Sequence, residues 1–369
     1  MEKNRKESDP IELFAAANSG EGFKSFYDGI FDTSEIERRY LIKGGPGTGK
    51  STFMRTVAKE AEERGLSVEY YRCSSDPQSL DAVVIEGRAA VLDATSPHNV
   101  EPRLVGARDE IVNLGIFWDN DGLSSQLELI RELTSAKAEQ YKRAYQFLSA
   151  AMTLDNVIRE ASLRYTDKEK MKRAARRYAS TIPFGDGFSL KVGICGSVGM
   201  QGSIRLDTYE KNASSLYYVR DYHRTGSLFI AKIIEEAQKN RNAVRVSYCP
   251  INPSYPDAVT FVDTGETFVL SDAPGESPAS DGKRVKIINM KRFIGAYGLT
   301  KEAQREYKLN ARMYDALILS AEECLRRAGE YHFELEEIYK RYVDFGAQSI
   351  FARSFAEFVV SRLCGDERA

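Results

Sequence analysis

The residues with the clearest chemical meaning form one glycine-rich loop, Gly44–Ser51, which matches the pattern G-x-x-x-x-G-K-[ST] at every fixed position. Glycines let consecutive backbone N–H groups converge on a phosphate without clashes from Cβ atoms. In such a loop Lys50 reaches the β- and γ-phosphates, and the Ser51 hydroxyl ligates Mg²⁺. We therefore expect ATP or another nucleoside triphosphate with Mg²⁺ as cofactors, held by Gly44, Gly45, Pro46, Gly47, Thr48, Gly49, Lys50, Ser51 and Thr52.

A loop of this kind needs an acidic residue at the end of a second buried strand to hold the Mg²⁺ and its water shell. Asp93 follows an apolar run about forty residues after Lys50, and we expect it to be a magnesium ligand and a catalytic residue. An aspartate that simply ends a strand at a turn is the open alternative.

The catalytic base is not identified by the sequence. Ala94 follows Asp93, at a position where many hydrolytic motor ATPases carry the glutamate that polarises the attacking water. The base must then come from elsewhere or be absent. The candidates in the next loop or turn are His98, which we favour, and Glu101, Asp109 and Glu110, and a surface role is open for each of them.

These residues need a strand, a loop and a helix to position them. The β-branched and aromatic run 39–43 predicts a strand before the glycines, and the run 51–64 predicts a helix after them. The backbone N–H groups and the partial positive charge at the start of that helix then favour an anion in the loop.

The chain also repeats itself, with an offset of 176 residues. Cys73 and Pro77 recur as Cys249 and Pro253, and the run 81–83 recurs as 257–259. An upstream echo pairs residues 14–23 with residues 178–188. The repeat predicts two similar strand–helix–strand units, each followed by a helical stretch.

The second copy of the loop is degenerate. The same offset places Arg220, Asp221, His223 and Thr225 where the first copy has glycines, and Gly226 where it has Lys50. Bulky side chains would fill the space that a phosphate needs, and Asp221 would repel it. A carboxylate equivalent to Asp93 remains near Asp272 only if the alignment slips by a residue or two. A separate glycine-rich stretch, 193–203, lacks a lysine and is interpreted as a loop.

The motifs at 22–28, 42–52, 73–81 and 92–98 together resemble an uncharacterised bacterial family of tandem P-loop proteins, whose members are usually labelled only as ATPases or nucleotide kinases. The resemblance is strong over about the first 120 residues and is traceable further through the repeat. It implies nucleotide binding. It also implies an intact P-loop in both halves, from which this chain departs at 220–226.

Composition limits the classes of partner. The chain has 52 basic and 54 acidic residues and a net charge of −2, so no overall field favours nucleic acid or a membrane. The five cysteines are scattered without metal-binding spacing, which is typical of reduced thiols in a cytoplasm. No apolar run approaches eighteen residues, and the charged N-terminus is not followed by an apolar segment. We expect a cytoplasmic protein.

The segment 131–178 carries twelve Lys and Arg residues against six Asp and Glu, and 168–177 is its most basic part. A nucleic-acid contact would gain from counterion release, but a solvated helix face is favoured because no aromatic residues are interleaved. Arg103 and Arg108 could stabilise charge on the γ-phosphate, as could Arg224 if the two halves face each other across one nucleotide, but a surface role is favoured for all three.

The sequence thus predicts an α/β protein of tandem P-loop NTPase-like parallel-sheet domains. The active half spans 1–185 with a helical arm at about 121–180, and the degenerate half spans 186–369 with an arm at about 300–369. The favoured function is an Mg²⁺-dependent nucleoside triphosphatase acting through the first half. A nucleotide or small-molecule kinase and a nucleotide-gated interaction protein with little turnover, which would have an unknown protein partner, are the alternatives.

Overall fold

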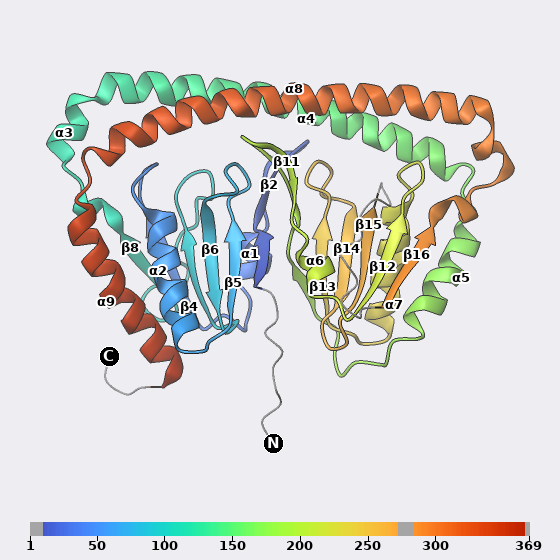
Figure 1. The fold of residues 1–369 in the computed structure, drawn as a ribbon, viewed down its shortest axis with the longest axis horizontal. Helices are drawn as coiled ribbons and strands as arrows, with labels where there is room; N and C mark the ends of the chain where they lie inside the picture. Colours follow the sequence, from blue (N-terminus) through green and yellow to red (C-terminus); the bar gives the residue numbers. More distant parts are fainter. Residues whose placement is uncertain (1–9, 272–283, 366–369) are drawn as a thin grey trace.

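The computed structural model describes residues 10–271 and 284–365, which form two six-stranded mixed sheets that are mostly parallel (Figure 1). The first sheet has the order β1 (Ile11–Phe14), β5 (Val68–Arg72), β6 (Leu80–Ile85), β7 (Ala89–Asp93), β4 (Arg38–Lys43) and β8 (Asp109–Asn113). The second has the order β9 (Leu190–Val192), β13 (Val244–Tyr248), β14 (Pro256–Phe261), β15 (Glu266–Ser271), β12 (Ser215–Arg220) and β16 (Arg284–Asn289).

The two sheets have the same topology. In each one the third strand, β6 or β14, is antiparallel to both of its neighbours, and the other pairings are parallel. The equivalent strands β5 and β13 begin at Val68 and Val244, which agrees with the offset of 176. The architecture is therefore α/β and consistent with the predicted repeat.

The repeat extends to the smaller elements. The hairpin β2 (Ala16–Ser19) and β3 (Gly22–Ser25) has its counterpart in β10 (Gly196–Gly199) and β11 (Gly202–Arg205). The remaining pairs are α1 (Tyr27–Phe31) with α6 (Thr208–Lys211), α2 (Lys50–Glu63) with α7 (Gly226–Lys239), and the 3₁₀ turns η1 (Leu114–Phe117) with η2 (Met290–Phe293).

This pairing corrects two sequence interpretations. The glycine-rich stretch 193–203 is not a loop, because most of it forms the hairpin β10–β11. The true counterpart of the β2–β3 hairpin is this hairpin, so the proposed echo at 178–188 was misaligned. Gly199 is needed there because a Cβ at this position would lie 2.5 Å from the Ser75 carbonyl oxygen.

Two long helices, α4 (Leu127–Leu163) and α8 (Lys301–Lys340), lie side by side above both sheets (Figure 1). The short helix α3 (Asn120–Ser125) precedes α4, and the turn η3 (Ala296–Leu299) precedes α8. Ala144 and Leu148 of α4 share a buried cluster with Ala321 and Leu325 of α8. Each long helix therefore contacts the carboxyl-end loops of both halves.

The shorter helices that follow are exchanged between the halves. The helix α5 (Lys168–Ala179) packs on α7 of the second sheet, and α9 (Phe345–Cys364) packs on α2 of the first. Phe355, Val359 and Val360 of α9 lie in the same buried cluster as Phe53 and Val57 of α2. Burying such side chains contributes about 1.5–3 kcal/mol each, which fixes the exchange. The helical arms therefore do not stay with the halves that precede them in the sequence.

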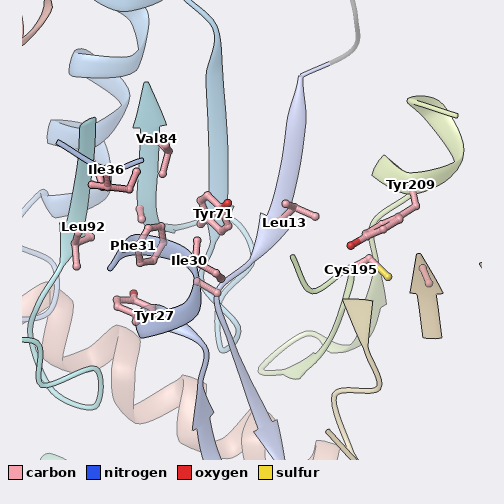
Figure 2. Packing of buried hydrophobic residues seen from close by; sticks show 14 of the residues in the cluster. Leu13, Tyr27, Ile30, Phe31, Ile36, Tyr71, Val84, Leu92, Cys195 and Tyr209 are labelled. Atoms are coloured by element: carbon pink, nitrogen blue, oxygen red, sulfur yellow. The ribbon is translucent and has the colours of Figure 1, made fainter. Parts of the chain in front are cut away.

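The edges of the two sheets meet through β1 and the segment after β9. Phe14 and Ile194 exchange backbone hydrogen bonds of 2.7 and 3.2 Å. Leu13 lies in one buried cluster with Cys195 and Tyr209 of the second half (Figure 2). The halves thus share a core and cannot separate without exposing it.

All five cysteines lie within the described residues, and each is a free thiol. Among the described residues, no helix is both long enough and apolar enough to cross a membrane.

Candidate active site

The glycine-rich loop joins β4 to α2 as the sequence predicts. Its left-handed positions are Gly47, with φ +65°, and Gly49, with φ +81°. A Cβ on Gly47 would also lie 2.8 Å from the backbone of Glu336 in α8. Glycine is therefore required at Gly47 both by the backbone conformation and by the helix that crosses above it.

Lys50 and Asp93 meet beside this loop. The strand β7 lies next to β4 and parallel to it, with Asp93 opposite Ile42. The Lys50 Nζ lies 3.5 Å from Asp93 Oδ2 and donates hydrogen bonds to the carbonyls of Gly44 and Gly45 at 3.2 and 2.7 Å. Because the carboxyl ends of parallel strands share one edge, both charges lie where the loop would hold a phosphate.

Ser51 and Asp93 are the residues that could hold Mg²⁺. Ser51 Oγ accepts a hydrogen bond from the Leu80 N–H at 3.1 Å, which fixes the hydroxyl and leaves a lone pair. Within residues 10–271 and 284–365 no cluster of three or more His, Cys, Asp or Glu side chains could hold a metal by itself. A magnesium site bound to nucleotide needs only one or two protein ligands, because phosphates and water supply the rest. The two residues fit that role.

The loop opens into a cavity of about 1440 Å³ that side chains of α4 and α8 also line. The long C-terminal helices contribute to the loop itself: the Gln348 side chain donates to the Thr48 carbonyl at 2.9 Å. No pattern in the sequence predicts that α9 contacts the first loop, because amphipathic periodicity does not specify which sheet a helix covers.

A second cation that sequence reasoning missed enters the cavity from α4. Lys137 lines the cavity with Lys50, and among the described residues it makes no hydrogen bond or ion pair. Burial and then the nearby Lys50 lower the pKa of Lys137. In the sequence Lys137 is one of twelve basic residues of the arm, and only the packing of α4 distinguishes it.

His98 also lines the cavity, as predicted, and it has an acidic partner that was not predicted. Its Nε2 lies 3.4 Å from Asp81 Oδ1, and the two side chains are 5% and 4% exposed. Burial lowers the pKa of His98, but Asp81 and then Asp93 raise it, and the net shift is upward.

The other candidate bases lie outside the cavity. Glu101 pairs with Lys43 and is mostly exposed. Asp109 is buried, and hydrogen bonds from Arg39 hold its pKa well below its ordinary value. Glu110 is an exposed residue of β8. None of the three lines the cavity.

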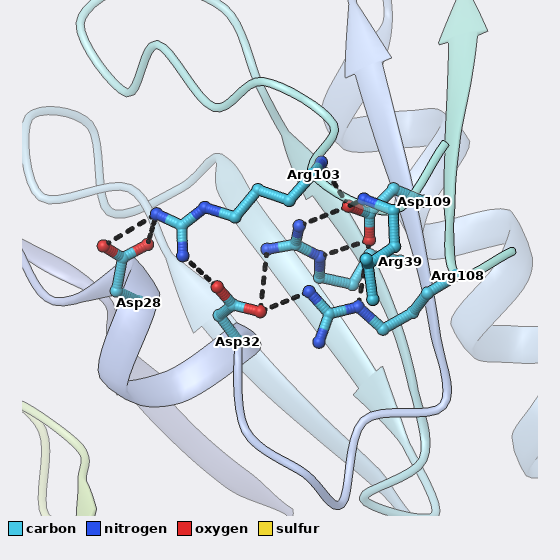
Figure 3. A network of polar contacts seen from close by, with 7 residues as sticks. Asp28, Asp32, Arg39, Arg103, Arg108 and Asp109 are labelled. Carbon is cyan, nitrogen blue, oxygen red and sulfur yellow. Dashed lines mark hydrogen bonds and ion pairs between the residues drawn. The ribbon is translucent and has the colours of Figure 1, made fainter. Parts of the chain in front are cut away.

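Arg103 and Arg108 belong to the same structural network as Asp109 (Figure 3). Arg103 pairs with Asp28 and Asp32, and Arg108 pairs with Asp32 and Asp109. The network ties α1 to the strands β4 and β8. The prediction that these arginines face the γ-phosphate is therefore wrong.

The second half has a shorter loop between β12 and α7. The sheet register pairs Lys43 with Asn113 and Arg220 with Asn289, so Arg220 is the counterpart of Lys43 and not of a glycine. The predicted alignment shifts by one residue there. The same register places Leu270 opposite Val219, where the first half has Asp93 opposite Ile42. The predicted retention of an acidic residue through Asp272 falls outside the described residues.

In the second loop, the carboxylate of Asp221 binds backbone N–H groups. Asp221 Oδ1 accepts hydrogen bonds from the N–H groups of Tyr222 and Gly226 at 2.7 and 2.6 Å. By contrast, no side chain caps the first residues of α2. The carboxylate thus uses backbone donors that a phosphate would need in the second half.

Arg224 points away from the first site. It pairs with Asp155 of α4 at 2.9 Å and stacks on Tyr314 of α8 at 3.9 Å. Asp155 also binds Arg159, whose Nη1 donates to the Arg224 carbonyl and to Ser227 Oγ. The expected donation of Arg224 to the first half is therefore wrong, because Arg224 fills its own half's loop region.

The His223 side chain also occupies the loop region of the second half. Its ring is stacked between Tyr222 and Tyr307, with centroids 4.2 and 4.0 Å away, and burial lowers its pKa to about 4.

The basic stretch 168–177 is α5, which buries Met171, Ala174 and Ala175 against the second half. Its charges form the opposite, solvated face of an amphipathic helix.

Comparison with protein-family models, with curated proteins and with solved structures found no match.

Proposed function

We propose that the first half binds a nucleoside triphosphate with Mg²⁺ and that the protein is a nucleoside triphosphatase, with ATP as the favoured nucleotide. The observation that carries this is the convergence of Lys50, Ser51 and Asp93 at the mouth of a glycine loop, with no side chain capping the start of α2. In the second half, Gly226 and Leu270 stand at the counterparts of Lys50 and Asp93. Ser227 keeps the hydroxyl, but Asp221 binds the N–H of Gly226.

The residues have separate roles in this proposal. Residues 44–49 supply backbone donors, and Lys50 neutralises the outer phosphates. Ser51 and Asp93 would hold Mg²⁺, which when bound offsets the negative charge of the phosphates. Lys137, which makes no ion pair in the described chain, supplies a further positive charge from α4 as charge develops on the transferred group.

A kinase is the second candidate, and the size of the cavity favours it. Pockets for small ligands commonly measure about 300–1,000 Å³. This one, at about 1440 Å³, has room beyond one nucleotide and reaches Asn18, Tyr145 and Met200. A hydroxyl-bearing acceptor would compete there with water.

The test measures nucleotide binding and NDP release by the full chain, in water alone and with a panel of alcohols and nucleotides. Water-driven release supports the triphosphatase, and acceptor-dependent release supports the kinase. Binding without release would support instead a nucleotide-gated interaction protein.

Lys50→Ala is the decisive variant for the site. Charge-assisted contacts of this kind contribute about 1.5–3 kcal/mol, so we expect ATP affinity to fall about ten- to a hundredfold and NDP release to disappear. Lys59→Ala, an exposed lysine on the same helix, is the matched control. Near-normal binding and release by a folded Lys50→Ala protein would refute the phosphate-loop assignment.

A further inference from the structure

Three buried polar atoms beside the cavity have no hydrogen-bond partner in the described chain: Asp81 Oδ2 and His98 Nδ1, whose residues line the cavity, and the hydroxyl of Tyr27, which packs on His98. Leaving such atoms unpaired costs about 1–3 kcal/mol each, so three in one place need an explanation. Asp81 and Tyr27 are 3% and 4% exposed. The cluster is too deep in the protein to be a solvated surface.

The three side chains are held close together by ring packing. The Tyr27 ring stacks on the His98 ring with centroids 4.6 Å apart, and the Phe23 ring packs edge-on against His98 at 5.3 Å. Tyr27 belongs to α1 and Phe23 to β3, whereas Asp81 belongs to β6. Three separate elements thus fix one imidazole, which is typical of a group whose orientation matters.

The cluster lies next to the phosphate loop. Asp81 directly follows Leu80, whose N–H binds Ser51 Oγ, and His98 follows Asp93 by five residues. Asp81, Asp93, His98 and Lys50 all line the same cavity. The pair is therefore placed beside the end of the loop where the γ-phosphate would lie.

The counterpart of Asp81 in the second half has different neighbours. Asp257 is the repeat counterpart of Asp81, and it faces Arg205, whose Nη1 lies 3.6 Å from Asp257 Oδ2. The Arg205 guanidinium also contacts Cys195 and Glu210. Asp257 is neutralised by a fixed cation, whereas Asp81 pairs with a titratable imidazole and lies beside the neutral Tyr27 and Cys73 side chains.

We infer that Asp81 and His98 form the general base of the first-half site, accepting the proton of an O–H nucleophile that attacks the γ-phosphate. This inference rests on the proposed function and names the base that the sequence does not identify. Water and an alcohol share the required chemistry, and the experiment separates them.

The step balances with the groups present. The His98 Nε2–H donates to Asp81, which leaves the lone pair on Nδ1 to take the proton of the nucleophile. The nucleophile oxygen bonds to the γ-phosphorus, and the bond from that phosphorus to the β–γ bridging oxygen breaks. Its electrons leave with the nucleoside diphosphate. The product is inorganic phosphate from water or a phosphate ester from an alcohol.

The titratable groups around His98 set the pH dependence. Asp81 and Asp93 favour its cationic form, and Lys50 opposes it. Tyr27 and Cys73, also beside Asp81, stay neutral because burial and then Asp81 raise the pKa of each group. Turnover should therefore rise with pH as His98 loses its proton, with a midpoint above its ordinary pKa of about 6.5.

The experiment compares His98→Gln and Asp81→Asn with the wild-type chain, measuring ADP affinity and NDP release from pH 5 to 9, in water and with the alcohol panel. We expect NDP release to fall at least about a hundredfold in His98→Gln, because general bases commonly contribute a factor of about 10²–10⁴. ADP affinity should stay within about threefold. The acid limb of the profile should disappear in His98→Gln and move to lower pH in Asp81→Asn. Glu101→Gln, an exposed carboxylate outside the cavity, is the control.

The outcomes are distinguishable. If both variants release NDP within threefold of wild type, the assignment of the base is wrong and the proposed function stands. If the wild-type chain binds ADP but releases no NDP with water or any alcohol, the proposed function fails and the base assignment fails with it. Loss of ADP binding in both variants would assign the pair to nucleotide binding and overturn its role as base.

Discussion

The two loops of this chain show how one topology can carry an open glycine loop in one half and a loop filled by side chains in the other. In the first half, Gly47 and Gly49 carry the left-handed backbone, and Lys50 and Asp93 face the loop. In the second, His223 and Arg224 hold left-handed conformations with φ +52° and +59°, and Asp221 binds the start of α7. The strand order is the same, so the loops differ in their side chains and in the one residue by which the second loop is shorter.

The cations of the two halves differ in the same way. In the second half, Arg159 and Arg224 both bind Asp155, which closes a buried charged cluster. In the first half, Lys137 enters the cavity without an ion pair in the described chain, although the nearby Glu336 carboxylate of α8 favours its charged form. Since α4 provides Lys137, Asp155 and Arg159, a single helix leaves one site charged and neutralises the other.

The largest difference between the halves lies at one equivalent position, where the first half has Asp93 and the second has Leu270. Asp93→Asn tests the importance of the charge at this position. The amide keeps the shape but loses the charge that we assign to Mg²⁺. We expect ATP affinity in Mg²⁺ to fall about tenfold and turnover to fall with it. Binding without Mg²⁺, measured as the internal control, should change less. An unchanged Mg²⁺ dependence would place the metal ligand elsewhere.

The sequence predicted the strand, loop and helix around Lys50 better than it predicted the packing of the later helices. Residues 39–64 carry a strand pattern, a glycine loop and a helix pattern in immediate succession, so local physics was enough there. The offset of 176 likewise identified equivalent strands. Which sheet α5 and α9 cover depends on long-range packing of apolar faces, such as Phe355 against Phe53, and no local pattern encodes it.

Long-range packing also explains why sequence reasoning missed some residues of the site. Lys137 looks like the other basic residues of its arm until α4 is placed above the loop. Asp81 was recognised only as part of the repeat, because its proximity to His98 depends on the order of β6 and β7 in the sheet. Arg103, Arg108 and Arg224 were candidates for the γ-phosphate with a surface role favoured, and each is held by aspartates within the described chain.

Lys137→Met tests whether the cation that α4 places in the cavity contributes to turnover. Methionine keeps the aliphatic packing of the side chain and removes its charge. We expect the turnover number to fall about tenfold, with ATP affinity within about threefold, because the charge acts as negative charge develops in the transition state. Arg143→Met, an exposed position of the same helix, is the control. Equal losses of affinity and turnover would show that Lys137 binds the ground state instead.

Asp221→Ala tests the smallest difference between the halves, which is the carboxylate that binds the start of α7 in the second half only. Removing the carboxylate should lower the free energy of unfolding by about 1 kcal/mol, as the loss of a helix cap does. Nucleotide stoichiometry should not change, because the second loop still lacks a lysine at Gly226. Urea titration against Asp263→Ala, an exposed aspartate, measures the stability effect. A second bound nucleotide in Asp221→Ala would mean that Asp221 alone blocks that loop.

The central claim is that one chain binds one triphosphate. A fragment starting near Gly185 cannot test it, since such a fragment lacks α4 and α5, which pack on the second half. Titration calorimetry of the intact chain with ATP and Mg²⁺ tests it most directly. The account predicts one nucleotide per wild-type chain and no tight site in Lys50→Ala. Two equivalent sites per chain, with one remaining in Lys50→Ala, would contradict it.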